Sequence, residues 1–180
     1  MNSSTTPDCK AASTCRISKD FEYLRQLEAF AGTPPEVIKL FAYLVKHRVY
    51  AAGQCIVEKG DPADCAFLVI KGSIAIVTIH KQAEVSLQHL DSGSFCGGMA
   101  LLARFSWPFT ARAITETEII IIDRESFRKV MEKYPERQSA VVEKIIQLRI
   151  ARMEQQTHNM LDLILASGLE NNAEGKSSIL

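Results

Sequence analysis

Four glycines divide the middle of the chain into short apolar runs, and this punctuation limits the fold more than any other feature. Gly53, Gly60, Gly72 and Gly93 separate stretches rich in β-branched residues, which is the pattern of short strands joined by turns. Many short strands of this kind indicate an antiparallel roll or barrel of two sheets. The predicted strands cover residues 47–51, 55–58, 66–71, 73–80, 84–90, 111–114 and 118–122.

Two helices are predicted before the strands. In residues 21–30, Phe21, Leu24 and Leu27 fall on one helical face. In the next segment, Thr33-Pro34-Pro35-Glu36 has the form of a capping box with prolines in the first turn, where a missing N–H does no harm. Apolar residues then recur at helical spacing up to Val45, so a second helix follows directly.

Two further helices are predicted after the strands. Asp123 is a suitable cap for a short helix that stops before Pro135. A long helix then covers residues 135–166, with Gly168 as its stop. The expected fold is therefore mainly β with flanking helices, followed by a long C-terminal helix.

An apolar stripe at heptad spacing runs along this last helix and favours a homodimer formed through it. A second stripe, Val141, Ile145 and Leu148, leaves the alternative that the helix folds back on the strands. The predicted dimer residues, spaced 4, 3, 4, 3 and 4, are Ile146, Ile150, Met153, Thr157, Met160 and Ile164.

Charge and hydropathy exclude several partners. The 21 basic and 21 acidic residues balance, so no general attraction to DNA or to acidic lipid is expected. The longest apolar runs, residues 66–70 and 119–122, are too short to cross a membrane. Five cysteines without C-x-x-C spacing, after an N-terminus unlike an export signal, favour free thiols in the cytoplasm.

The chain divides into four segments by composition. Residues 1–16 are rich in Ser and Thr and are predicted to be a disordered tail, as are residues 169–180. Residues 17–133 form the β domain with its N-terminal helices, and residues 134–168 form the long helix.

The four histidines are well separated and no cysteines have zinc-ligand spacing, so no metal site and no catalytic residue is predicted, and the chain is expected not to be an enzyme.

Several motifs in a fixed order resemble the cyclic nucleotide-binding domain family over about residues 30–131. The resemblance implies an eight-stranded jelly roll (a double-stranded β-helix) flanked by helices, with a phosphate-binding cassette between its sixth and seventh strands. The motifs are Gly53, Glu58-Lys59-Gly60-Asp61-Pro62-Ala63-Asp64, Phe67-Leu68-Val69-Ile70-Lys71-Gly72-Ser73-Ile74, Leu90-Asp91-Ser92-Gly93-Ser94-Phe95 and Ile122-Asp123-Arg124-Glu125-Ser126-Phe127.

The cassette implied by this resemblance lacks its two charged side chains. In the family it reads approximately Phe-Gly-Glu-Leu-Ala-Leu-Leu, then Pro-Arg-Ala-Ala; the Glu binds the ribose hydroxyl and the Arg binds the phosphate. Here Gly98 stands in place of the Glu and Phe109 in place of the Arg. Each lost bond costs roughly 1.5–3 kcal/mol, so binding of cyclic AMP or cyclic GMP is expected to fall by about two to four orders of magnitude.

Backbone N–H groups at the start of the cassette helix would still attract a phosphate. Arg104 is a further candidate for contacting an anion, whereas Arg112 should point away from the face of Phe109. Trp107, with Phe105 and Phe109, either lines the pocket or plugs it. By correspondence the ligand-binding candidates are Cys96, Gly97, Gly98, Met99, Ala100, Phe109 and Thr110.

The function expected is that of a non-enzymatic regulatory sensor or adaptor with an unidentified protein partner. Bacterial transcription regulators of this kind carry a helix-turn-helix domain after the long helix, and residues 171–180 are too few for one. One alternative is a ligand-free scaffold or dimeric interaction protein. Another is a sensor of a small molecule that is not a nucleotide.

Overall fold

The computed structural model describes residues 8–166, with side chains from Cys15 onward. The chain falls into two compact units, Met1–Ile145 and Ile146–Leu180. The predicted helix stop at Gly168 and the predicted tails over residues 1–7 and 169–180 lie outside the described residues.

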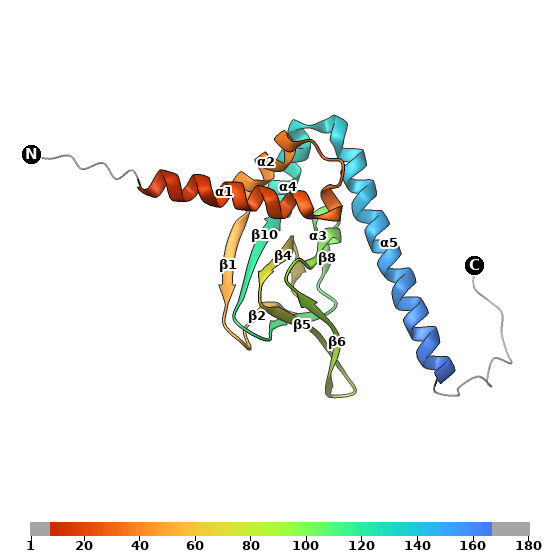
Figure 1. Ribbon diagram of the computed structural model, residues 1–180. Coiled ribbons are helices and arrows are strands. Elements are labelled where there is room, and N and C mark those ends of the chain that lie inside the picture. Colours follow the sequence, from red (N-terminus) through yellow and green to blue (C-terminus); the bar gives the residue numbers. More distant parts are fainter. Residues whose placement is uncertain (1–7, 167–180) are drawn as a thin grey trace, which may run out of the picture. The chain divides into compact units, whose positions relative to one another are not determined.

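Two four-stranded antiparallel sheets make up the roll of the first unit (Figure 1). One sheet has the order β1-β10-β4-β7 and the other β2-β9-β5-β6, while β3 and β8 form a separate two-stranded ribbon. The eight strands of the two sheets are the arrangement expected of a jelly roll. The strands are β1 (Lys46–Tyr50), β2 (Cys55–Val57), β3 (Pro62–Ala63), β4 (Cys65–Lys71), β5 (Ser73–His80), β6 (Ala83–Asp91), β7 (Phe95–Cys96), β8 (Phe105–Ser106), β9 (Thr110–Ala113) and β10 (Thr117–Asp123).

All seven predicted strands are present, with ends within one residue of the prediction. The three strands that the sequence did not reveal, β3, β7 and β8, are two residues long, too short to carry an alternating pattern. They form only because partners lie alongside: Pro62 pairs with Ser106, and Phe95 with Leu68.

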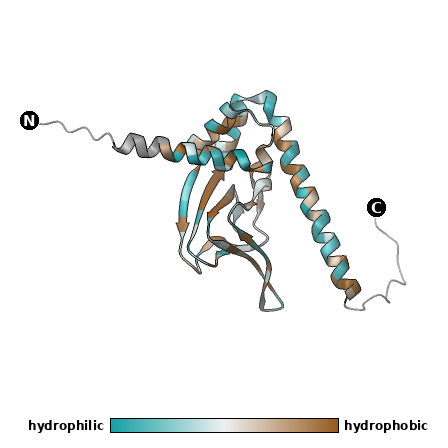
Figure 2. Ribbon diagram, in the orientation of Figure 1, coloured by the Kyte–Doolittle hydropathy of each residue, from teal (hydrophilic) through white to brown (hydrophobic). Residues whose placement is uncertain are grey.

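The strands β4 and β10 lie side by side and are buried on both faces. Phe67 and Ile119 face the core shared by the two sheets, and their neighbours Leu68 and Ile120 are buried as well. Double burial explains why both strands read as continuous apolar runs rather than as alternating ones. Figure 2 shows these hydrophobic stretches in brown along the roll.

The helices of the first unit gather at one end of the roll (Figure 1). Asp123 caps α4 as predicted, because its carboxylate accepts a hydrogen bond of 2.7 Å from the Ser126 N–H. The predicted capping box at Thr33 is wrong: Pro34 is the N-cap and no side chain caps the helix. The helices are α1 (Asp8–Gln26), the 3-10 turn η1 (Glu28–Phe30), α2 (Pro35–Leu44), α3 (Gly98–Leu102), α4 (Arg124–Lys133) and α5 (Pro135–Ala166).

The first helix differs from the prediction at both ends. It already includes residues 8–16, which we predicted to be a tail, and it ends at Gln26, with η1 completing the segment predicted as one helix. Ala11 and Ala12 have high helix propensity, and the helix continues into a turn fixed by packing of Leu24. A polar contact adds to this packing: the buried Asp20 lies 2.9 Å from the ring of His47 on β1.

The long helix has the predicted bounds, residues 135–166. Val141 and Ile145, in the part that belongs to the first unit, are buried. Every residue from 149 to 166 is exposed, although teal and brown alternate along the helix in Figure 2. Among the described residues no helix is long and apolar enough to span a membrane.

Candidate functional site

The turn from β7 into α3 depends on a glycine in the left-handed region. Gly97 has φ 86° and ψ 9°, and its carbonyl accepts a hydrogen bond of 2.8 Å from the Ala100 N–H. A side chain at this φ is strained, and glycine avoids the strain. Cys96, just before it, is buried in the core, and Ala100 is fully buried, so the backbone of the predicted cassette is held from both ends.

There is also no room for a side chain at Gly97. A Cβ placed there would lie 2.7 Å from the Cys65 carbonyl oxygen, 3.0 Å from the Ala66 Cα and 2.9 Å from Trp107 Cη2. Two of these neighbours are backbone atoms of β4 and the third is the tip of an indole ring. The close approach of β4 and Trp107 is therefore a second reason for the glycine.

Gly98, which stands where the family has a glutamate, is also tightly packed. A Cβ at this position would lie 3.2 Å from Phe95 Cε1 and 3.3 Å from Ile145 Cγ2. Ile145 belongs to the start of α5 and is itself 4% exposed. A side chain at Gly98 would therefore start in tight contact with Phe95 and with Ile145 of α5, and these two side chains would have to shift slightly to admit it.

An aromatic cluster fills the roll next to the cassette. Trp107 is 4% exposed and belongs to the core shared by the two sheets. Its ring centroid lies 5.4 Å from that of Phe109, 6.1 Å from Phe105 and 6.5 Å from Phe67. The sequence left open whether Trp107 lines a pocket or fills it, and this packing favours a ring that fills the space.

The remaining candidates lie at the edge of this cluster or outside it. Phe109 is half-buried and packs on the core. Thr110, at the start of β9, accepts a hydrogen bond of 3.1 Å from the Lys59 backbone N–H. Arg104 is exposed beyond the end of α3, and Met99 is half-buried on α3. Arg112 points away from the core, as expected, and its guanidinium lies 2.9 Å from the Glu84 carboxylate.

Arg124 is the residue whose role at the cassette the sequence did not reveal. Its guanidinium donates hydrogen bonds to three backbone carbonyls: 2.6 Å to Ala100, 2.7 Å to Ala103, and a third to Ala63. The first two acceptors belong to the end of α3, where helix carbonyls lack intrahelical partners. Arg124 therefore fixes α3 to β3 and to the start of α4, and it was visible only as part of the Ile122–Phe127 motif.

The surroundings of the cassette disfavour negative charge. Burial, together with the nearby Asp64 and Asp123 carboxylates, raises the pKa of the Cys65 thiol to about 12. The carbonyl of the same residue contacts Gly97. The Arg124 guanidinium is engaged by three carbonyl oxygens, so it does not compensate the desolvation of a phosphate here.

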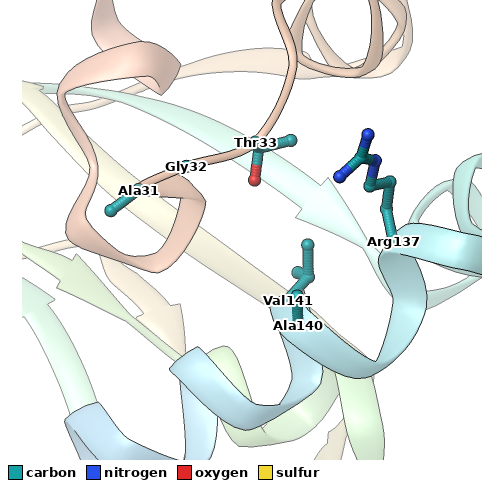
Figure 3. Close-up of a pocket in the computed structure, with 6 residues that line it drawn as sticks. All are labelled: Ala31, Gly32, Thr33, Arg137, Ala140 and Val141. Carbon is teal, nitrogen blue, oxygen red and sulfur yellow. The ribbon is translucent and has the colours of Figure 1, made fainter.

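A small pocket lies away from the cassette, between the turn before α2 and the first turns of α5 (Figure 3). Its volume is about 40 Å³, enough for a few water molecules and far below the several hundred cubic ångströms that drug-sized ligands occupy. Within residues 15–166 no cluster of three or more His, Cys, Asp or Glu side chains is placed to hold a metal ion. The pocket is lined by Ala31, Gly32, Thr33, Arg137, Ala140 and Val141.

Comparison with known proteins gives the family of this site. The model of the cyclic nucleotide-binding domain matches residues 47–134. A solved cyclic nucleotide-binding-like protein from Brucella abortus is 31% identical, with a TM-score of 0.59; the match covers 63% of this chain and 98% of that one. A cyclic nucleotide-binding domain from Methylobacillus flagellatus has a TM-score of 0.71 over 94% of this chain and 89% of that one, but at 14% identity it speaks for the fold alone.

Curated relatives are longer. The cyclic AMP receptor protein of Thermus thermophilus is 28% identical over 107 residues, which are 59% of this chain and 50% of the relative. The chain spans between 13% and 50% of the first three curated relatives that it matches. The roll, the cassette turn at Gly97 and these similarities together place the chain in the cyclic nucleotide-binding domain family.

Proposed function

We propose that this chain is a non-enzymatic regulatory module in which binding of cyclic AMP or cyclic GMP is weak or lost. The observation that carries the proposal is Gly98. The carboxylate that would hold the ribose is absent, and a Cβ at this position would lie 3.2 Å and 3.3 Å from side-chain atoms of Phe95 and Ile145, which would have to shift by a few tenths of an ångström to admit one. The apolar Phe109 at the second altered position adds to the loss.

The consequence for affinity follows from the two missing contacts. Each hydrogen bond to a charged group is worth about 1.5–3 kcal/mol, and about 1.4 kcal/mol changes Kd tenfold. A nucleotide that a relative binds with a Kd of about 1 μM would then bind here with a Kd of about 0.1–10 mM. Regulation would have to come from another ligand or from a protein partner.

Thermal unfolding in the presence of nucleotides tests this proposal. A ligand present at a thousand times its Kd stabilises the folded state by about 4 kcal/mol, so 1 mM of a micromolar ligand would shift the melting temperature clearly. With 1 mM cyclic AMP, cyclic GMP or a cyclic dinucleotide we expect a much smaller stabilisation, about 1.4 kcal/mol at most. A shift that saturates in the micromolar range with either mononucleotide would overturn the proposal.

We also propose that the second unit mediates homodimerisation as a parallel coiled coil. In a heptad, Ile146, Met153 and Met160 occupy the d positions, and Ile150, Thr157 and Ile164 the a positions. These side chains are all exposed within the chain, although apolar residues at such spacing normally lie against another helix. The polar Thr157 fits the seam because its hydroxyl donates to the Met153 carbonyl at 2.9 Å and needs no further acceptor.

Charge complementarity favours a second copy of this chain in parallel orientation. Arg149 precedes an a position and Glu154 follows a d position, so they take the g and e positions five residues apart. In a parallel coil the g residue of one helix faces the e residue of the next heptad on its partner. Each dimer would therefore contain two Arg149–Glu154 pairs, whereas an antiparallel coil would bring like positions together.

Charge reversal tests the pairing. Arg149→Glu or Glu154→Arg alone should weaken dimerisation by about 1–2 kcal/mol, roughly tenfold in Kd, and an equimolar mixture of the two should recover it as a heterodimer. Arg152→Glu, a charge reversal at the outer c position, is the matched control and should have no effect. Analytical ultracentrifugation measures all four; a chain that is monomeric at every concentration, or a mixture no tighter than its components, would refute the coil.

Two alternatives have different support. The burial of Trp107 in the core supports the ligand-free scaffold over a sensor of a non-nucleotide molecule, because a ligand in the roll would need room beside this ring.

We propose that the module lies in the cytoplasm, where thiols such as those of Cys15, Cys55 and Cys65 stay reduced.

A further inference from the structure

Trp107 occupies the interior of the roll directly against the cassette turn. Its Cη2 lies 2.9 Å from the position that a Cβ on Gly97 would take, and the side chain is 4% exposed. Phe109 is the residue that the family resemblance puts at the phosphate-binding position. It is only half-buried, and its ring centroid lies 5.4 Å from that of Trp107. Among the described residues after α3, Trp107 is therefore the one whose side chain lies next to Gly97.

The backbone of Trp107 is held by two hydrogen bonds. The Trp107 N–H donates to the Asp61 carbonyl at 2.8 Å, and the Trp107 carbonyl accepts from the Gly60 N–H at 2.8 Å. On either side of the ring, Phe67 and Phe109 lie at centroid distances of 6.5 Å and 5.4 Å. Two backbone hydrogen bonds and the aromatic contacts together hold Trp107 in this position.

A ligand phosphate at the Gly97 turn and the Trp107 ring would require the same volume. Interiors are packed at the density of organic crystals, so an added group must displace an existing one. The indole is also apolar, with a single N–H, and offers a phosphate no compensating charge. Replacing the Trp107 ring by a ligand would thus cost both the packing of the ring and the desolvation of the anion.

We propose that the Trp107 indole is a built-in occupant of the roll, which takes the place of a ligand and holds the cassette in one state. This inference deepens the proposed function by naming the residue that sets the specificity of the site. It places the determinant at Trp107 rather than at Phe109. A flat aromatic molecule of the size of indole is the ligand class that the vacated site would accept.

The wild-type protein supplies a direct readout because Trp107 is its only tryptophan. We expect an emission maximum typical of a buried indole and acrylamide quenching several-fold weaker than in the urea-unfolded chain. We also expect neither to change with 1 mM cyclic AMP. Emission that is freely quenched in the folded protein would overturn the inference, and this measurement needs no variant.

Removing the indole tests whether the ring fills a ligand-sized space. Trp107→Ala should lower the melting temperature strongly, and free indole should raise it again in a saturable manner. Phe105→Ala, which removes a ring in edge contact with Trp107 from a partly exposed position, is the matched control and should gain nothing from indole. If Trp107→Ala folds and indole does not stabilise it, the inference fails; if it does not fold, the wild-type quenching decides.

The outcomes separate this inference from the proposed function. Cyclic AMP that binds wild type tightly and exposes the tryptophan would refute weak binding but support Trp107 as the occupant. Cyclic AMP that binds tightly and leaves the emission unchanged would refute both. Absence of cyclic AMP binding, combined with no indole effect on folded Trp107→Ala, would leave the proposed function standing and remove the built-in occupant.

Discussion

Replacing Gly97 by alanine measures how tightly the cassette turn is packed against β4 and Trp107. Gly93→Ala is the matched control, because the φ of Gly93 (89°) is almost the same as that of Gly97 (86°). A Cβ at Gly93, however, would have no atom within 4 Å. Both substitutions pay the strain of an L-residue in the left-handed region, about 1–2 kcal/mol. Both also restrict the unfolded chain equally, so the difference between them isolates the collision.

The magnitude of that difference follows from the neighbours. At Gly97 the new methyl group would lie 2.7 Å from the Cys65 carbonyl oxygen and 3.0 Å from the Ala66 Cα, and backbone atoms of a doubly buried strand have little freedom to yield. Overpacking a core typically costs about 1–3 kcal/mol. We therefore expect Gly97→Ala to lower the free energy of unfolding by about 1–3 kcal/mol more than Gly93→Ala does.

Urea unfolding followed by circular dichroism and by Trp107 fluorescence measures both variants. The same difference should appear as a gap of a few degrees in melting temperature, since about 1 kcal/mol corresponds to about 2–4 °C for a chain of this size. Because Cη2 is the third close neighbour, the emission of Trp107 should change in Gly97→Ala and not in Gly93→Ala. Equal losses in the two variants would refute the packing argument.

Three further predictions concern residues around the cassette. Arg124→Lys should lower the free energy of unfolding by at least about 2 kcal/mol, because one ammonium cannot bind all three carbonyls that the guanidinium joins, those of Ala63, Ala100 and Ala103. Amide hydrogen exchange should become faster in α3. Unchanged exchange there would contradict this role of Arg124. At pH 7, Asp123→Ala should cost about 0.5–2 kcal/mol as the loss of the α4 cap. Burial acts to raise the Asp123 pKa, but hydrogen bonds from Ser126 and Lys46 prevail and lower it. Its contribution is therefore present above the unfolded pKa and is lost as the pH falls through the folded value, so the two urea curves should converge in acid and a gap independent of pH would be contrary evidence. Finally, an aromatic disulfide reagent at pH 8 should modify the exposed Cys15 well before Cys65, because burial is the main reason that the pKa of the Cys65 thiol is raised to about 12. Peptide mass spectrometry measures both rates, and equal rates would contradict the burial of this thiol.

Local sequence signals were enough for most of the secondary structure. The glycine-bounded runs gave seven strands with ends within one residue, and the Asp123 cap and the bounds of the long helix were confirmed. These elements were predictable because a turn glycine, a capping carboxylate and an apolar period each act within a few residues. The same reasoning was wrong at residues 8–16, where polar composition concealed a helix, and at Thr33, where a capping pattern is present without the capping bond.

The family motifs predict which turn is the cassette, and they predict that two charged side chains are absent from it. They did not fix which side chains fill the space. The resemblance put Phe109 at the phosphate-binding position, and in the structure the Trp107 ring lies next to Gly97, with its segment held by the Gly60 and Asp61 backbone and by the β3–β8 pairing. Two-residue strands leave no pattern in a sequence.

The sequence by itself determined the antiparallel roll, and it predicts the cassette turn and its missing charges, since these depend on residue types and on spacing along the chain. Only the tertiary structure decided that Gly98 lies close to Ile145, that Arg124 joins three carbonyls and that the Trp107 indole lies against Gly97. Each of these contacts joins segments 20 or more residues apart or depends on the path of a connecting loop. Their geometry follows from how β4, α3 and the start of α5 pack together, and no short-range pattern encodes it.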